Sequence, residues 1–210
     1  GWLARRLDLA GTTNEGVLFV GAHKWSTDLA LTLQKAGCPV LVVSDSWKNL
    51  QQSRLQGLPI HYGEILSESV DESLELADMG YLLATTGNHA YNSLVCSVFI
   101  QHFGRNRVFQ IATNEKKMEK KQLSGLFRGK VLFGGNLIYK ELILQFIEGW
   151  RFQKTRLTEE FDLETLKDNN KGKLKPFIRI QSNGELDLDF FEDQTGAAPG
   201  DTIISFSKKT

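Results

Sequence analysis

The sequence predicts an α/β fold: a doubly wound parallel sheet of about six strands, followed by a small C-terminal β-rich subdomain. Three observations lead to this prediction. Short continuous apolar runs recur along the chain, helical patterns lie between them, and after Trp150 the pattern changes to short strands separated by polar, turn-rich stretches. Strands that are buried on both faces read as continuous apolar runs, and strands that alternate with helices form parallel sheets. The six runs are residues 17–20, 40–43, 60–62, 81–84, 108–111 and 131–133.

Helical patterns fill the gaps between these runs. In the first gap, Leu29 and Leu33 lie on one face of a helix, Ser26 is expected to cap its N-terminus, and Gly37 stands where a left-handed C-cap is needed. The other expected helices are residues 48–56, 69–77, 89–103 and 136–149.

The chain is expected to divide into three parts. Residues 1–15 are interpreted as a linker from a preceding membrane region, because Trp2 and Leu3 stand beside an Arg pair without an initiator Met; the start of a surface helix would look the same. Residues 16–150 form the Rossmann-like parallel-sheet domain, and residues 151–210 form the β-rich subdomain. Its expected strands are an alternating segment at 151–157 and short runs at 176–180, 185–188 and 202–206.

Composition and charge argue against several classes of protein. The 210 residues include 25 Lys and Arg and 25 Asp and Glu, so the chain lacks the one-signed charge that favours nucleic acid or an anionic membrane. It has no run of about 18 apolar residues and no signal-peptide pattern, so we expect a soluble, intracellular fragment without direct bilayer insertion. Cys38 and Cys96 lie far apart and are interpreted as buried thiols.

The first strand runs directly into the segment Gly21-Ala22-His23-Lys24-Trp25-Ser26, which opens a helix. This is the position of the G-x-G-x-x-G turn that binds the phosphates of a dinucleotide. Only the first glycine is present. His23 stands where the second glycine normally lets a pyrophosphate approach the backbone, and Ser26, which is small enough for close helix packing, replaces the third.

Polar residues also follow the next three strands. Asp45 comes after the second strand, where an acid accepts hydrogen bonds from ribose hydroxyls; the alternative is that Asp45 caps the helix beginning near Ser46. The third strand leads into Gly63-Glu64, and the fourth into the segment 85–89. Because the carboxyl ends of parallel strands meet at one edge, we expect a ligand crevice there, although ordinary turn chemistry would explain each loop separately.

Other candidate sites favour structural interpretations. His61 and His102 are expected to be structural, and His23 with His89 would make a poor metal site because no carboxylate lies near them in the sequence. We therefore expect no metal. The acidic segment 159–162 and the charge run 116–121 are interpreted as solvated surface.

Residues 60–92 resemble the RCK or KTN (TrkA-N-like) domain, which regulates potassium channels and cation:proton antiporters by binding nucleotides. The residues that carry the resemblance are His61-Tyr62-Gly63-Glu64, Leu76-Ala77-Asp78, the segment 83–88, and Asn92. The resemblance extends from about Gly16 to Gly149. It implies that the 21–26 turn meets the phosphate, Asp45 the ribose, and the two later turns the base and ribose side. The candidate site is Gly21, Ala22, His23, Lys24, Trp25, Ser26, Asp45, Ser46, Gly63, Glu64, Thr85, Thr86, Gly87 and Asn88.

The segments at 1–6, 155–162 and 200–205 are similar to the cytosolic tails of bacterial Na⁺ or K⁺/H⁺ antiporters. This resemblance implies a transmembrane antiporter domain in the same full-length chain, a place at the cytoplasmic face of the inner membrane, and a homodimer. In agreement, the helix expected at 136–149 is apolar around more of its circumference than a surface helix needs; it would face a second subunit or, alternatively, the β-rich subdomain.

These observations favour a regulatory domain over an enzyme. A small NAD(P)-dependent oxidoreductase needs a proton-handling residue beside the nicotinamide, and no Tyr-x-x-x-Lys pair or Cys with a supporting His is evident. A second alternative is the RCK subunit of a K⁺ channel that binds NAD(H) or ATP. We expect AMP to be favoured over NAD(H), because His23 occupies space that two linked phosphates need, and a protonated His23 or Lys24 would add a charge-assisted hydrogen bond as pH falls.

Overall fold

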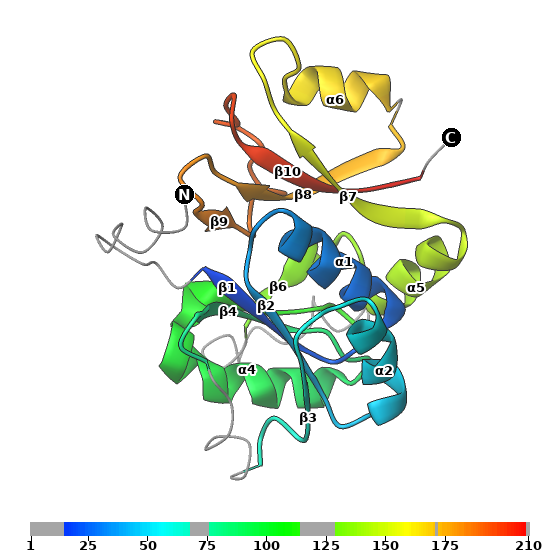
Figure 1. Ribbon diagram of the computed structural model, residues 1–210, viewed down its shortest axis with the longest axis vertical. Helices are drawn as coiled ribbons and strands as arrows, with labels where there is room; N and C mark the ends of the chain where they lie inside the picture. Colours follow the sequence, from blue (N-terminus) through cyan, green and yellow to red (C-terminus); the bar gives the residue numbers. More distant parts are fainter. Residues whose placement is uncertain (1–14, 68–75, 114–128, 171, 209–210) are drawn as a thin grey trace.

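The structure is a computed structural model that describes residues 15–67, 76–113, 129–170 and 172–208. Its first sheet has six parallel strands in the order β3-β2-β1-β4-β5-β6 (Figure 1). This confirms the predicted Rossmann-like class, in which the strand order reverses between β1 and β4. The strands are β1 (Gly16–Val20), β2 (Val40–Ser44), β3 (Ile60–Tyr62), β4 (Met79–Ala84), β5 (Val108–Gln110) and β6 (Lys130–Val131).

Helices cover both faces of this sheet. The first face packs on α1 (Lys24–Lys35), α2 (Trp47–Leu55) and α5 (Tyr139–Ile147), and the second on α4 (His89–Phe103) (Figure 1). Alternate strand residues point to opposite faces, which explains why Val17 and Phe19 belong to the first core and Leu18 and Val20 to the second. With both faces covered, the two central strands β1 and β4 are buried at every position, which explains their continuous apolar sequence.

Among the described residues of this part of the chain, turns of 3₁₀ helix lie at Arg105–Arg107 and Leu132–Gly135. The second corrects the expectation of a strand at 131–133, because the chain leaves the sheet after Val131 and Phe133 takes a left-handed backbone conformation with φ of 58°. The helix expected at 136–149 is also shorter, since Ile138 pairs with Ala112 and α5 begins only at Tyr139.

The start of α1 differs from the prediction. His23, in extended conformation, is the N-cap, and Ser26 lies three residues inside the helix. The hydroxyl of Ser26 accepts a hydrogen bond from the backbone N–H of His23 at 2.9 Å and lies 3.1 Å from the Gly21 carbonyl, to which it donates. Ser26 therefore stabilises the turn between Gly21 and His23 from a position inside the helix. At the other end Gly37 adopts φ of 94°, as a C-cap glycine should.

The second sheet is antiparallel, in the order β7-β10-β8-β9, and carries a short helix, α6 (Leu163–Asn169). Its strands are β7 (Trp150–Arg156), β8 (Leu174–Ile180), β9 (Leu186–Asp187) and β10 (Thr202–Lys208). The helix α6 was not expected from the sequence. Asp162 caps it by accepting a hydrogen bond from the Thr165 N–H at 2.8 Å, and Leu166 packs in the small core beneath it.

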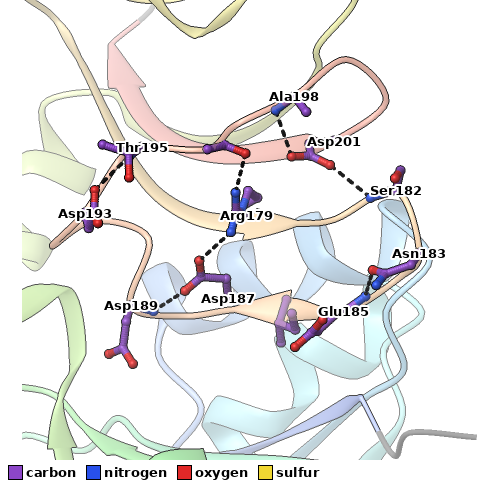
Figure 2. A network of polar contacts seen from close by, with 12 residues as sticks. Arg179, Ser182, Asn183, Glu185, Asp187, Asp189, Asp193, Thr195, Ala198 and Asp201 are labelled. Carbon is purple, nitrogen blue, oxygen red and sulfur yellow. Dashed lines mark hydrogen bonds and ion pairs between the residues drawn. The ribbon is translucent and has the colours of Figure 1, made fainter.

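Buried polar groups hold the loops of the second sheet in place (Figure 2). The Asp201 carboxylate, 4% exposed, accepts hydrogen bonds from the backbone N–H groups of Ser182 and Ala198, each at 3.0 Å. Arg179 bonds Asp187 at 3.2 Å and donates to the Gly196 carbonyl at 2.8 Å. Asp201, which lies in the 200–205 segment singled out in the sequence, therefore has a structural role.

The two sheets share one hydrophobic core. Phe133 packs on Phe177 with ring centroids 4.3 Å apart, and Phe152 on Phe206 at 4.7 Å. Polar contacts join the sheets as well. The Tyr81 hydroxyl donates to the Leu186 carbonyl at 2.9 Å. On α1, the carboxylate of Asp28 accepts a hydrogen bond from the Phe152 N–H at 2.8 Å.

Some sequence expectations concern residues that the structure does not describe. The linker 1–15, except for Glu15, most of the helix 69–77 and the whole charge run 116–121 lie outside the described residues. Within the described residues both thiols are free and buried, and burial raises the pKa of Cys38 and of Cys96 to about 12. No helix in the described ranges is long and apolar enough to cross a membrane.

Candidate functional site

The candidate site lies at the switch point, where the turns after β1 and β4 are adjacent. Gly21 adopts φ of 107°, and a Cβ at this position would lie 2.9 Å from Cγ2 of Thr86. The Thr85 hydroxyl, fully buried, lies 3.0 Å from the Val20 carbonyl and 2.9 Å from the Gly21 carbonyl. Glycine is therefore required at position 21 both for its backbone angle and for the close approach of the two turns.

A small hollow of about 20 Å³ opens at this edge of the sheet. Four of the predicted site residues line it from four different turns: Gly21, Asp45, Gly63 and Thr86. Asp45 is exposed, and α2 is capped by the backbone of Ser46, so Asp45 is not the cap of this helix. Its carboxylate forms no hydrogen bond or ion pair within the described part of the chain, which leaves its oxygens able to accept from a ligand.

Tyr91 of α4 lines this hollow and bonds Glu64, which follows Gly63. The Tyr91 hydroxyl donates to the carboxylate of Glu64, which also accepts from the Leu66 N–H at 3.3 Å. Burial and then the neighbouring Glu64 carboxylate raise the pKa of Tyr91, so its hydroxyl stays protonated and remains a donor. Glu64 is thus bound to the protein itself instead of pointing freely into the hollow.

Asn92 fixes the turn after β4. Its side chain is fully buried; its oxygen accepts from the Thr86 N–H at 3.2 Å and its amide donates to the Thr86 carbonyl at 2.8 Å. Asn88 caps α4 by accepting from the Tyr91 N–H at 3.1 Å. The backbone of Thr86 is therefore held in one orientation toward Gly21.

The side chains of the 22–25 turn face a different space. Together with α2 and α5 they line a cleft of about 430 Å³ on the first face of the sheet. The cleft has cationic and amide groups on one wall and apolar groups of α5 on the other. Its lining residues are Ala22, His23, Lys24, Trp25, Lys48, Asn49, Gln52, Ile143, Phe146 and Ile147. The structure therefore divides the predicted set: Gly21, Asp45, Gly63 and Thr86 meet in the hollow, and the 22–25 side chains do not.

Comparison with known proteins bears on this arrangement. Residues 17–127, more than half of the chain, match the TrkA-N domain family. The chain belongs to the TrkA-N family. This confirms the resemblance inferred from the motifs in residues 60–92.

Solved structures resemble this TrkA-N domain at low identity. The NAD(P)-binding domain of an exopolyphosphatase-related protein from Archaeoglobus fulgidus is 17% identical, with 64% of this chain and 95% of that chain covered and a TM-score of 0.47. The TrkA-N domain of the inner membrane protein ybaL from Escherichia coli is 14% identical, with 64% and 94% covered and a TM-score of 0.45. The GsuK channel bound to NAD is 13% identical, with 93% and 36% covered and a TM-score of 0.47. No curated protein matches the chain.

His23 of this TrkA-N domain is half-buried, and its ring meets Tyr139 of α5 edge-on with centroids 5.2 Å apart. Burial lowers the pKa of His23, so the neutral imidazole is favoured at pH 7. A protonated His23 would therefore attract a phosphate only at a lower pH than a histidine with the ordinary pKa would. Lys24 is the other basic residue of this turn and the better candidate to contact a phosphate.

Three residues of the TrkA-N site were not assigned a role from the sequence: Tyr91, Asn92 and Tyr139. Tyr91 and Asn92 come three and four residues after the Asn88 cap, so their place on the first turn of α4 was a usable signal. Tyr139 lies 116 residues from its partner His23 and gave no local signal. The other histidines supply no metal site, since no group of three or more His, Cys, Asp or Glu within the described residues is arranged to hold a metal ion.

Proposed function

We propose that this TrkA-N domain binds an adenine nucleotide, AMP in preference to NAD(H), and thereby regulates a monovalent cation:proton antiporter in the same full-length chain. The observation that supports it most is the hollow at the switch point, where Asp45 and the backbone turns at Gly21, Gly63 and Thr86 come together in a chain of this family. Doubly wound sheets bind nucleotides at this edge. The proposal includes a location at the cytoplasmic face of the membrane.

In the proposed mode of binding, the ribose hydroxyls donate to the Asp45 carboxylate. The phosphate lies at the N-terminus of α1, where the first N–H groups of the helix and its dipole favour an anion. Lys24 contributes charge at this end. Signalling then requires that the nucleotide binds two states of the domain with different affinities.

The same proposal holds that the domain is not an enzyme. A nucleotide sensor needs a site and a responsive surface but no acid or base. Two polar side chains near the hollow are already engaged, since Glu64 accepts from Tyr91 and Thr85 donates to backbone carbonyls, and the proposal gives the Asp45 carboxylate to the ribose. The test is hydride transfer from NADH or NADPH to carbonyl and quinone acceptors. Turnover above the rate without protein would favour the oxidoreductase alternative.

Replacing Asp45 by alanine is expected to weaken AMP binding by about 1.5–3 kcal/mol, because the variant loses hydrogen bonds to a charged acceptor. Isothermal titration calorimetry of both proteins measures the difference. Asp168→Ala, which removes an exposed carboxylate from α6 far along the chain, is the matched control and should bind AMP like the wild type. Unchanged affinity in Asp45→Ala would remove Asp45 from the site, and no binding of any adenine nucleotide at millimolar concentration would refute the site itself.

We also propose a homodimer that uses the outer face of α5. The inner face of this helix packs on α1 and β7 through the fully buried Leu142, as the alternative interpretation of the sequence had it. The outer face nevertheless leaves Leu144 60% and Ile147 76% exposed. Apolar side chains grouped on one exposed face favour association.

The dimer is tested by analytical ultracentrifugation of the wild type and of Ile147→Glu. We expect the wild type to sediment as a dimer and the variant to shift toward the monomer, because a charge would be buried at the interface. Leu94→Glu, which changes an exposed leucine on α4, is the comparison. A wild-type monomer at high concentration, or a dimer lost only in Leu94→Glu, would show that α5 is not the interface.

A further inference from the structure

Tyr139, the first residue of α5, lies across the two turns of the switch point. On one side its hydroxyl is 3.3 Å from Nδ1 of His23, and its ring is 6.5 Å from that of Trp25. On the other side a Cβ built on Gly87 would lie 2.9 Å from Cε1 of Tyr139, so the ring is in close contact with the turn after β4. One side chain thus contacts both the turn that follows β1 and the turn that follows β4.

The backbone on either side holds this ring in position. The Tyr139 N–H donates to the Ala112 carbonyl at 2.7 Å, and the preceding residue pairs with Ala112 in a parallel bridge. The carboxylate of Glu141 accepts from the Ile138 N–H at 3.2 Å. One turn into the helix, Leu142 is fully buried in the main core. The backbone at Tyr139 is therefore fixed in the fold, and the half-buried ring lies against His23 and Gly87.

Its location matters for the length of the ligand. A doubly wound sheet consists of two mononucleotide-binding halves that meet at the switch point, and a dinucleotide crosses from one half to the other. Asp45, after β2, belongs to the first half, and Gly87, after β4, begins the second. The second nucleoside of NAD must therefore pass between the His23 turn and the Gly87 turn, where the Tyr139 ring lies.

We infer that Tyr139 is a specificity-determining residue whose ring closes the passage between the two halves and restricts the site to adenine mononucleotides. This inference rests on the proposed function and adds the structural element that selects the ligand. The ring, and not the hydroxyl, fills the passage, since it is the ring that contacts Gly87.

The test compares the dissociation constants of AMP and NAD⁺ for the wild type, Tyr139→Ala, Tyr139→Phe and Ile143→Ala. In Tyr139→Ala we expect NAD⁺ to bind at least about tenfold more tightly, with AMP affinity changed by less than about threefold. Tyr139→Phe keeps the ring and should behave as the wild type. Ile143→Ala, one turn further along α5, controls for loosening of the helix and should leave the ratio of the two constants unchanged.

A series of ligands on the wild type gives a second measurement that needs no variant. AMP, ADP, ADP-ribose and NAD⁺ are titrated, and affinity should fall at the step from ADP to ADP-ribose, where the second ribose enters the passage. The absence of a fall at this step would overturn the inference.

The remaining outcomes separate the two proposals. A ratio that is unchanged in Tyr139→Ala, or one that changes equally in Ile143→Ala, overturns the role of Tyr139 while AMP binding by the wild type keeps the proposed function. NAD⁺ binding more tightly than AMP to the wild type overturns both the role of Tyr139 and the AMP preference in the proposed function, and leaves only adenine-nucleotide binding. If neither the wild type nor any variant binds an adenine nucleotide, the proposed function fails and the inference fails with it.

Discussion

Replacing Phe206 by alanine is expected to lower the free energy of unfolding by about 3–5 kcal/mol, which is the usual cost of truncating a buried phenylalanine. Phe206 is fully buried and packs on Phe152 at 4.7 Å and on Trp150 at 5.4 Å. These rings belong to the core that the two sheets share, and the surrounding aromatic side chains are too rigid to refill the space. A change of this size is a large fraction of the stability of a domain.

The measurement is urea unfolding followed by tryptophan fluorescence and by circular dichroism. Because one core supports both sheets, the two signals should change together in a single transition. Leu55→Ala is the control, since Leu55 is 81% exposed and its truncation should change stability by less than about 0.5 kcal/mol. Two separate transitions in the wild type, or a loss below about 1 kcal/mol in Phe206→Ala, would show that the sheets are stabilised independently.

Replacing Asn92 by leucine is expected to affect both stability and binding. Leucine has a similar shape but leaves the N–H and carbonyl of Thr86 without the partners that Asn92 supplies at 3.2 and 2.8 Å. A buried backbone group without a partner costs about 1–3 kcal/mol, and because Thr86 is partly buried we expect a loss of stability within this range. AMP affinity should also fall, because Thr86 lines the hollow and its turn is no longer fixed.

Thermal unfolding and calorimetry with AMP measure the two effects separately. Ser97→Ala is the matched control on the same helix, since it removes only a hydroxyl that donates to the Leu94 carbonyl at 2.7 Å. If Asn92→Leu bound AMP as tightly as the wild type while being less stable, Asn92 would be a stabilising residue with no part in shaping the site.

Much of the fold could be predicted because its signals are local. The residues of β3 and of α4 were predicted with the same bounds as the structure has, since an apolar run and a capped periodic pattern each identify an element without long-range information. Ser26 was misplaced because a serine at the cap and a serine three residues inside the helix bond the same turn. The helix α6 has only seven residues, which is too few for a periodic pattern to be recognised.

The site was predictable to the extent that it depends on strand ends. Gly21, Asp45, Gly63 and Thr86 meet because parallel strands deliver their carboxyl ends to one edge of the sheet. The pairing of Glu64 with Tyr91 and the position of Tyr139 over the switch point depend on how distant helices pack. No spacing in the sequence reports such contacts.

The bonds between α1 and β7 also limit how the molecule can move. A hinge needs a few residues whose backbone rotates while the parts on either side stay intact. A rotation of the parallel sheet against the antiparallel sheet would separate Asp28 from Phe152 and Tyr81 from Leu186. It would also open the aromatic core that the two sheets share. Packed interiors resist such deformation. We therefore expect the two sheets to move as one rigid body. Any signal would then pass to a neighbouring protein through the exposed helix faces and not through a hinge opening between the sheets.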